Sequence, residues 1–230
     1  MTTTARARVR AELTDEIKAV ARRQLAEEGA AALSLRAVAR EVGMVSSAVY
    51  RYFPSRDDLF TALIVDAYDA VGAAAEGADP GARTDVARRW LIVTRAVRAW
   101  ALANPQEYAL IYGSPVPGYR APAATIDPAA RVSVALLRIV HDGVVAGEIT
   151  ADDSVSIPRA VRGDLAAIRE LAAPDVADEV LVRALFVWAE MFGSISLELF
   201  GHLHDVIHDF DAYFDVQMRR AAALLVGSAT

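Results

Sequence analysis

Hydroxyl, phenol and guanidinium side chains are concentrated between residues 34 and 56 of this 230-residue chain. They belong to Ser34, Arg36, Ser46, Ser47, Tyr50, Tyr52 and Arg56. A hydroxyl donates and accepts hydrogen bonds, and arginine carries a permanent charge on a planar fork of donors. Such groups suit the binding of anionic oxygens and polar ring edges. Ala48 lies among them and offers a methyl group for apolar contact.

Residues with the spacing of a catalytic or metal site are few. No Gly-x-Ser-x-Gly, His-Glu-x-x-His, Gly-x-Gly-x-x-Gly or P-loop pattern occurs, and there is no cysteine. His202, His204 and His208 cluster, and the last two have the i, i+4 spacing of one helix face. Only Asp205 or Asp209 could complete a metal site. We therefore expect surface histidines, no catalytic residue, no metal and no cofactor, and the protein is not predicted to be an enzyme.

The composition indicates that the chain has more apolar residues than an ordinary globular protein. Hydrophobic residues make up 54% of the chain, above the usual share of about 45–50%, so a partner chain or a pocket could cover the excess. The absence of cysteine favours an intracellular location. No apolar run approaches the roughly 20 residues that span a bilayer, and the first residues lack the apolar core of a signal peptide. We expect a cytoplasmic protein with no membrane partner.

Charge is unevenly distributed. The net charge of −6 would by itself argue against binding nucleic acid, but residues 1–60 hold ten Lys+Arg against eight Asp+Glu, and the rest of the chain is acidic. Arg6, Arg8 and Arg10 precede the first acid, Glu12. This stretch is predicted to be a flexible cationic arm suited to phosphates or a minor groove, or else a solvated tail.

Apolar residues recur at helical spacing through most of the chain, and no strand alternation extends beyond a few residues. In the first part of the chain, N-capping residues and glycine or proline stops bound the predicted helices. These helices cover residues 14–29, 34–43, 46–54 and 55–75, with Thr14, Ser34, Ser46 or Ser47, and Ser55 at their starts. The second and third are short and separated by a glycine turn, which predicts a helix-turn-helix.

The second part of the chain also reads as helical. A Gly- and Pro-rich turn at 76–83 precedes it, and prolines make 113–124 a rigid loop. The predicted helices begin at Thr84, Pro105, Asp127, Pro158, Pro174 and Asp205. The helix predicted for 174–200 is apolar around most of its circumference, so it must be covered on two sides. A second copy of the chain is the simplest cover, which predicts a homodimer through the last two helices.

The run SLRAVAREVGMVSSAVYRYFPSRDDLFTAL, Ser34–Leu63, resembles the DNA-binding domain of the TetR family of bacterial regulators. Gly43, Tyr50, Phe53 and Arg56 match the family pattern. The resemblance implies an all-α protein with a three-helix helix-turn-helix domain and basic arm at 1–58 and a helical ligand-sensing and dimerisation domain at 59–230. It implies a transcriptional regulator, by family habit a repressor, that releases a palindromic operator when a small, largely apolar or aromatic ligand binds.

The same resemblance assigns roles at the DNA end. The start of the recognition helix, Ser46, Ser47 and Ala48, would face base edges, and Arg36 would contact guanine or a phosphate. Ser34 joins this set, and Tyr50, Tyr52 and Arg56 would hold phosphates. Alternatively, the tyrosines pack in the core with exposed hydroxyls and Arg56 is a solvated charge. Phe53 is assigned to the core. Two such modules would bind half-sites about 34–36 Å apart on double-stranded operator DNA.

Val45 departs from the family pattern, which often has a small polar residue at the start of the recognition helix. Ser46 is expected to take over as the cap, so the fold is unaffected while the base preference changes.

A second resemblance concerns the sensor domain. Asn104–Pro122 and Trp188–Leu199 are similar to a subgroup named for a Trp-x-x-x-His-Gly motif, with Phe192 in place of the histidine. The candidate ligand-binding residues are Trp100, Tyr108, Tyr112, Tyr119, Trp188 and Phe192. Aromatic residues at helical spacing can also belong to the hydrophobic core and line no cavity.

Two other interpretations of the function stay open: an enzyme or carrier of apolar molecules that retains a helix-turn-helix, and a regulator that responds to a protein and has no pocket.

Overall fold

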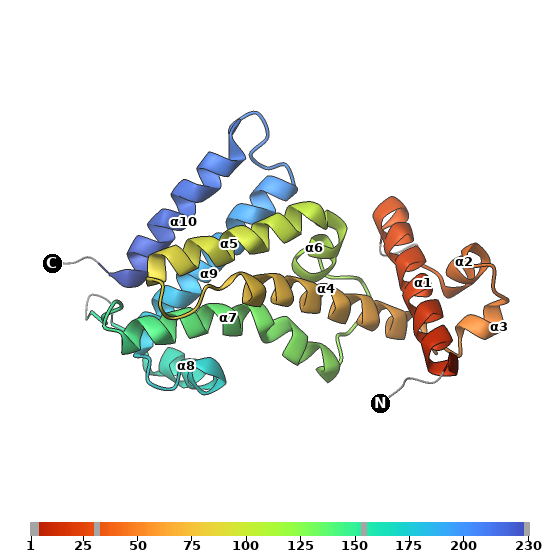
Figure 1. Cartoon of the computed structure of the whole chain (residues 1–230), viewed down its shortest axis with the longest axis horizontal. Helices are drawn as coiled ribbons and strands as arrows, with labels where there is room; N and C mark the ends of the chain where they lie inside the picture. Colours follow the sequence, from red (N-terminus) through yellow and green to blue (C-terminus); the bar gives the residue numbers. More distant parts are fainter. Residues whose placement is uncertain (1–4, 30–32, 153–155, 228–230) are drawn as a thin grey trace. The chain divides into compact units, whose positions relative to one another are not determined.

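The structure, a computed structural model, describes residues 5–29, 33–152 and 156–227. These residues contain no strand, which confirms the all-α fold class (Figure 1). The helices are α1 (Ala5–Glu28), α2 (Leu35–Glu41), α3 (Ser46–Val49), α4 (Arg56–Ala78), α5 (Val86–Ala103), α6 (Pro105–Tyr112), the short 3-10 helix η2 (Ala123–Thr125), α7 (Ile126–Val145), α8 (Arg159–Ala172), α9 (Asp178–Leu199) and α10 (Phe210–Val226).

The described residues pack into two compact units. Unit 1 holds the residues up to Asp69 together with Asn104–Pro128, and unit 2 holds Ala70–Ala103 and the residues from Ala129 onward. Helix α4 contributes its first part to unit 1 and its last part to unit 2. Residue 58, where the sequence predicts that the DNA-binding domain ends, lies in the first turn of α4.

Unit 1 is organised around a core to which α1, α2, α3 and the start of α4 each contribute. Ile17, Val38, Val49 and Phe60 are fully buried in it, and Phe53 is buried as the sequence predicts. Gly43 adopts a φ of +74° in the turn between α2 and α3, a conformation that favours glycine. The glycine turn and the apolar spacing together produce the predicted helix-turn-helix.

The start of α4 follows its sequence signal closely. The Ser55 hydroxyl accepts a hydrogen bond from the Asp58 backbone N–H at 3.1 Å and donates one to the Asp58 carboxylate at 2.7 Å. Asp57 and Asp58 lie in the first turn, where the helix dipole favours negative charge. The predicted cap is confirmed.

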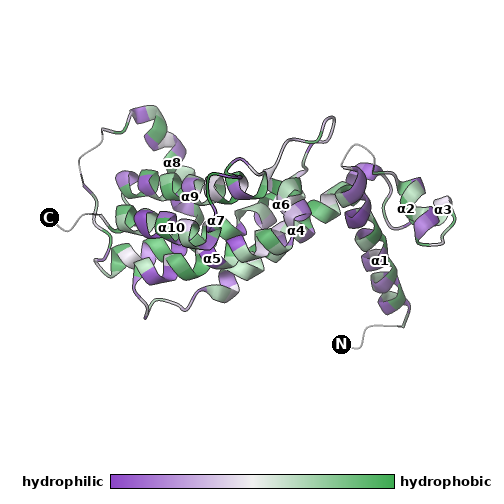
Figure 2. Cartoon of the chain, turned by 90° about the horizontal axis from the view of Figure 1, so that it is seen from above, coloured by the Kyte–Doolittle hydropathy of each residue, from purple (hydrophilic) through white to green (hydrophobic). Residues whose placement is uncertain are grey.

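The predicted flexible arm is wrong, because α1 already begins at Ala5. Its first turns consist of alanine and arginine, both strong helix formers, and Arg8 pairs with Glu12 one turn later at 3.6 Å. The Thr14 hydroxyl donates to the Arg10 carbonyl at 2.8 Å, inside the helix, and does not cap it. Most of α1 is coloured hydrophilic in Figure 2.

The last two helices begin later than predicted. Helix α9 starts at Asp178 and not at Pro174, since residues 174–175 form a turn before Ala177 at the N-cap. Helix α10 starts at Phe210, because the Asp209 carboxylate accepts from the Ala212 N–H at 2.9 Å and serves as the cap. Asp205, predicted to open this helix, instead has a φ of +62°.

Unit 2 is a helical bundle in which α10 packs against α5 and α9, and α8 packs against α9 (Figure 1). Its core includes Trp90, Ile139, Leu181, Met191 and Phe214, all at most 2% exposed. Within the described ranges α9 is the helix that is long and apolar enough to cross a membrane, but half of its most apolar window is buried inside the structure. The buried half of α9 belongs to the core of unit 2.

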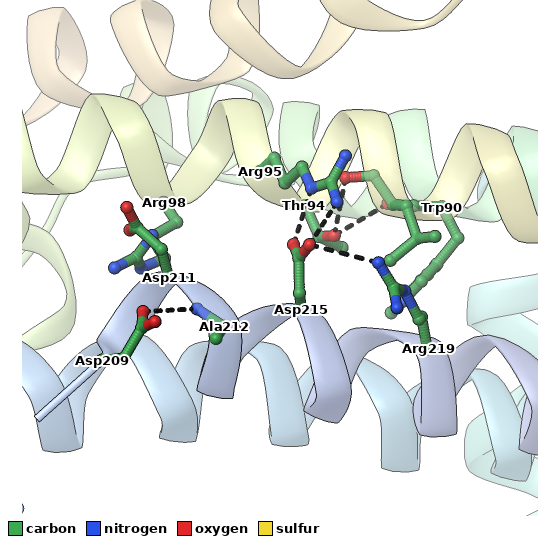
Figure 3. A network of polar contacts seen from close by, with 10 residues as sticks. Trp90, Thr94, Arg95, Arg98, Asp209, Asp211, Ala212, Asp215 and Arg219 are labelled. Carbon is green, nitrogen blue, oxygen red and sulfur yellow. Dashed lines mark hydrogen bonds and ion pairs between the residues drawn. The ribbon is translucent and has the colours of Figure 1, made fainter. Parts of the chain in front are cut away.

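Ion pairs join α5 to α10 (Figure 3) and also to α9. Arg98 pairs with Glu198 and with Asp211, each at 2.7 Å, and its guanidinium lies 5.2 Å from the Phe214 ring. Arg95 pairs with Asp215 along the same seam. These arginines of α5 therefore form ion pairs with both neighbouring helices of the bundle.

Arg89 on α5 is buried, with 3% of its side chain exposed. It pairs with Asp79 at 2.7 Å and with Asp142 at 2.8 Å, so its charge is balanced from two segments. Hydrogen bonding to the Arg89 guanidinium lowers the pKa of Asp79. These ion pairs connect the residue just after α4 and the last turn of α7 to α5 within unit 2.

We expect acid to destabilise the fold below about pH 4. Arginine hydrogen bonds lower the pKa values of Glu76, Asp79 and Asp215 in the folded chain. Their stabilising contribution is therefore complete above the unfolded pKa values of about 4 and is lost as pH falls through the lower folded values. Urea unfolding between pH 6 and pH 3 checks this. A free energy of unfolding that stays level or rises between pH 4 and pH 3 would contradict it.

Candidate functional site

The start of α3 projects a small exposed surface. Ser46 and Ser47 are exposed and Ala48 is half-buried. Val45 occupies the N-cap position without a side-chain cap and is 71% exposed, so the prediction that Ser46 becomes the cap is wrong. Buried Val49 anchors the helix, which leaves the hydroxyls and the Val45 methyls facing outward.

The preceding helix contributes a cation. Arg36 is exposed in the first turn of α2, next to Leu35, which is buried in the core. Ser34 takes the N-cap position of α2 with extended backbone angles, as predicted, but its hydroxyl makes no capping hydrogen bond. The structure therefore places Arg36 on the surface of the helix-turn-helix.

The two tyrosines after α3 differ in environment. Tyr50 is 43% exposed. Tyr52 is half-buried, with the Arg10 guanidinium 5.0 Å from its ring centre. Arg10 also donates to the Arg51 carbonyl at 3.0 Å. Arg10 had been assigned to a flexible arm, and its helical position next to the end of α3 could not be read from charge alone.

Arg56 serves the fold of unit 1 directly. Its Nε donates to the Leu33 carbonyl at 3.0 Å, and its guanidinium lies 4.8 Å from the Phe60 ring centre. The residue is half-buried and links α4 to the segment before α2. It is not a fully solvated charge.

Three of the candidate ligand-binding aromatics lie in unit 1. Tyr108 is fully buried, with its ring centre 5.1 Å from that of Tyr112. Tyr68 meets Tyr112 edge-on at 5.9 Å, and burial raises the pKa values of both residues. The Tyr119 hydroxyl hydrogen-bonds with that of Thr61 at 2.9 Å. Tyr108 and Tyr68 thus pack against Tyr112, whereas the Tyr119 ring lies 5.7 Å from that of Phe60, also in unit 1.

Unit 2 contains a cavity of about 260 Å³. Four helices line it, through Trp90 of α5, Ala130, Ser133, Leu136, Leu137 and Val140 of α7, Ile168 and Leu171 of α8, and Ala184, Leu185 and Trp188 of α9. Of the predicted ligand-binding residues, Trp188 lines this cavity. Phe192 packs against Trp188 with ring centres 5.0 Å apart, and Trp100 is half-buried outside the lining.

Sequence reasoning missed most of the lining. Trp90 and the α7 lining residues recur at helical spacing, which predicts that they lie on an inward face. A cavity forms where packed helices leave space, and helical periodicity shows which face is inward but not where that face lacks a neighbour. Within the ranges that the structure covers, no group of three residues is arranged to hold a metal ion.

Comparison with known proteins agrees with this architecture. Residues 17–63 match the family model of bacterial regulatory proteins of the tetR family, and residues 90–221 match that of the tetracyclin repressor-like C-terminal domain. The HTH-type transcriptional regulator Rv1816 of Mycobacterium tuberculosis is 42% identical over 222 residues, which cover 94% of this chain and 93% of that protein.

Solved structures extend the likeness to the whole fold. The crystal structure of the regulatory protein SCO4313 is 36% identical, with a TM-score of 0.76 over 95% of this chain and 98% of that one. A protein of unknown function from Rhodococcus sp. RHA1 is 26% identical, with a TM-score of 0.67 over 92% and 96% of the two chains. Both matched domains and the curated relatives are those of regulators and not of enzymes, and this chain is accordingly a DNA-binding transcriptional regulator that belongs to the TetR family.

Proposed function

We propose that the protein is a cytoplasmic repressor that binds a palindromic operator as a homodimer and releases it when a small, largely apolar or aromatic molecule binds unit 2. The observation that carries the DNA part is the exposed start of α3, held by buried Val49 after the Gly43 turn. A helix presented in this way can enter a major groove. The cavity in unit 2 supports the ligand part.

At the DNA, Ser46 and Ser47 would hydrogen-bond to base edges, and Ala48 and Val45 would contact thymine methyl groups. A serine hydroxyl can hydrogen-bond to any base, so these contacts discriminate only weakly between base sequences. Arg36 would contact guanine or phosphate. Ser34, Tyr50, Tyr52 and Arg56 complete the proposed interface as groups that hold the backbone and fix register.

The dimer would form through α9 and α10. Phe186 and Leu197 are 61% and 42% exposed, and with Ala189 and Gly193 they share one face of α9. A Cβ at Gly193 would meet nothing within 4 Å, so this face has room for an approaching helix. On α10, Val216 and Leu224 are 49% and 44% exposed. Two copies paired through these faces would form a four-helix bundle. The bundle would present the two recognition helices α3, called the two reading heads below, to half-sites about 34–36 Å apart.

The ligand would act by shifting a population. It releases the operator only if it binds more tightly to the form in which the two recognition helices are spaced wrongly for DNA.

We also propose that the C-terminal domain belongs to the subgroup named for the Trp-x-x-x-His-Gly motif, on the basis of Trp188 and Gly193. With Phe192 in the histidine position, the surroundings of Trp188 are more apolar than that motif implies.

Replacing Arg36 with alanine is expected to weaken binding to the DNA upstream of the protein's own gene about thirtyfold or more, because the proposed dimer loses two guanine or phosphate contacts and each costs about 1–3 kcal/mol. Fluorescence anisotropy at several salt concentrations measures this. A phosphate contact in each half-site would also lower the salt slope by about two in total, whereas a guanine contact would relax base preference at one position of each half-site.

Arg83→Ala, at an exposed arginine in unit 2, provides the control and should leave operator affinity unchanged. Equal affinity of the parent protein for the operator and for a scrambled duplex would contradict the proposal that it binds a specific operator, since a carrier of apolar molecules has no sequence preference.

A further inference from the structure

The unit 2 cavity is lined almost entirely by hydrocarbon. None of its eleven lining residues carries a charge, and its polar side-chain groups are the Ser133 hydroxyl and the indoles of Trp90 and Trp188. A charged group moved from water into such surroundings without a partner costs far more free energy than its contacts return. The cavity therefore selects an uncharged occupant.

The volume sets a size. An apolar cavity of about 150 Å³ holds a benzene molecule, and this cavity measures about 260 Å³. By proportion it accommodates roughly ten non-hydrogen atoms.

Two hydrogen-bond donors at this cavity have no acceptor among the described residues. The indole N–H groups of Trp90 and Trp188 are both buried and both lack a hydrogen-bond partner. Tryptophan can only donate, and a buried donor left unpaired costs about 1–3 kcal/mol. Two such donors in the lining of one cavity mark it as a place where an acceptor stabilises the protein.

The surrounding packing holds both indoles in place. Trp188 lies against Phe192 at an interplanar angle of 61°. A phenyl ring at that position offers no nitrogen to accept from either indole. Trp90 is 1% exposed, and it follows Arg89, whose two ion pairs hold this end of α5 to Asp79 and Asp142. Both donors are therefore held by packing in the wall of the cavity.

We propose that the cavity binds an uncharged, mostly apolar molecule of about ten non-hydrogen atoms that carries a carbonyl-type oxygen, and that this oxygen accepts from the indole N–H groups of Trp90 and Trp188. The Ser133 hydroxyl is the third polar contact available. The inference rests on the proposed function in taking this cavity as the effector site. It adds the chemical class of the effector.

Three molecules of nearly the same shape test the proposed chemistry of the cavity. Acetophenone, isopropylbenzene and benzoate each have nine non-hydrogen atoms and nearly the same outline, and they differ in offering a neutral acceptor, no acceptor and a charge. Calorimetric titration of the full-length protein without DNA measures their dissociation constants. Acetophenone and isopropylbenzene are expected to bind, and benzoate is expected to bind at least a hundredfold more weakly than acetophenone.

Tryptophan variants isolate the hydrogen bond. Trp188→Phe and Trp90→Phe are each expected to lower the affinity of acetophenone relative to isopropylbenzene about tenfold. The ratio is used because both probes lose the same packing. Trp100→Phe, at a half-buried tryptophan outside the lining, should leave the ratio unchanged. If Trp90→Phe does not fold, Trp188→Phe decides the question alone, since Trp188 is less buried.

The proposal is overturned if benzoate binds as tightly as acetophenone, or if the ratio is the same in Trp188→Phe as in the parent protein. Operator affinity with and without saturating acetophenone is measured separately. Discrimination among the probes with no change in operator affinity would uphold the cavity chemistry and reject the effector role. Loss of operator affinity with no discrimination among the probes would uphold the effector role and reject the proposed cavity chemistry.

Discussion

Phe186→Glu is expected to convert the protein from dimer to monomer and to lower its operator affinity at least a hundredfold. Phe186 is 61% exposed on α9, and burying such a side chain contributes about 1.5–3 kcal/mol from each copy. Glutamate at the same place would bring two buried negative charges toward a two-fold axis. A monomer keeps only one reading head, so it loses half of its DNA contacts.

Sedimentation velocity gives the oligomeric state and fluorescence anisotropy gives the operator affinity. Val145→Glu provides the control, because Val145 is 70% exposed on α7 and lies outside both proposed interface helices. That variant should remain dimeric and bind normally. If Phe186→Glu were also dimeric with parental affinity, the interface would have to lie elsewhere.

The second large effect concerns folding. Asp79→Ala is expected to lower the free energy of unfolding by about 3 kcal/mol, since removing one partner of a buried ion pair leaves the buried charge only partly compensated. Arg89 would then keep only Asp142, whose side chain is 36% exposed. Urea or thermal unfolding followed by circular dichroism measures the change.

Glu76→Ala serves as the matched comparison. Glu76 pairs with Arg131 at 2.6 Å, but the two side chains are 39% and 30% exposed, so the loss should be below about 1 kcal/mol. Equal losses in the two variants would show that burial of Arg89 contributes nothing to stability.

Much of the fold could be predicted because local signals and packing agree. The Ser55 cap, the Gly43 turn and Pro105 at the start of α6 each place a helix boundary through their own chemistry. The errors arose where two signals competed. Thr14 resembled a cap, but the arginine- and alanine-rich stretch before it is a better helix former. Asp205 and Asp209 both resemble caps, and only the second accepts from the α10 backbone.

The candidate site was less accessible to sequence reasoning. The exposed tip of α3 follows from the helix-turn-helix pattern, so Ser46 and Ser47 could be named in advance. The cavity depends on how four helices fail to fill the space between them, and nothing local to Ser133 or Ile168 marks them as lining. Similarly, the burial of Arg89 depends on Asp79 and Asp142, which are distant in sequence.

The central claim is that paired copies of the chain bind successive major grooves. The mass of the protein–DNA complex, measured by sedimentation with the duplex upstream of the protein's own gene and with a scrambled duplex, tests it most directly. The account predicts an even number of 24.7 kDa chains on the first duplex and much weaker binding to the second. One chain per duplex, or equal binding to both duplexes, would contradict it.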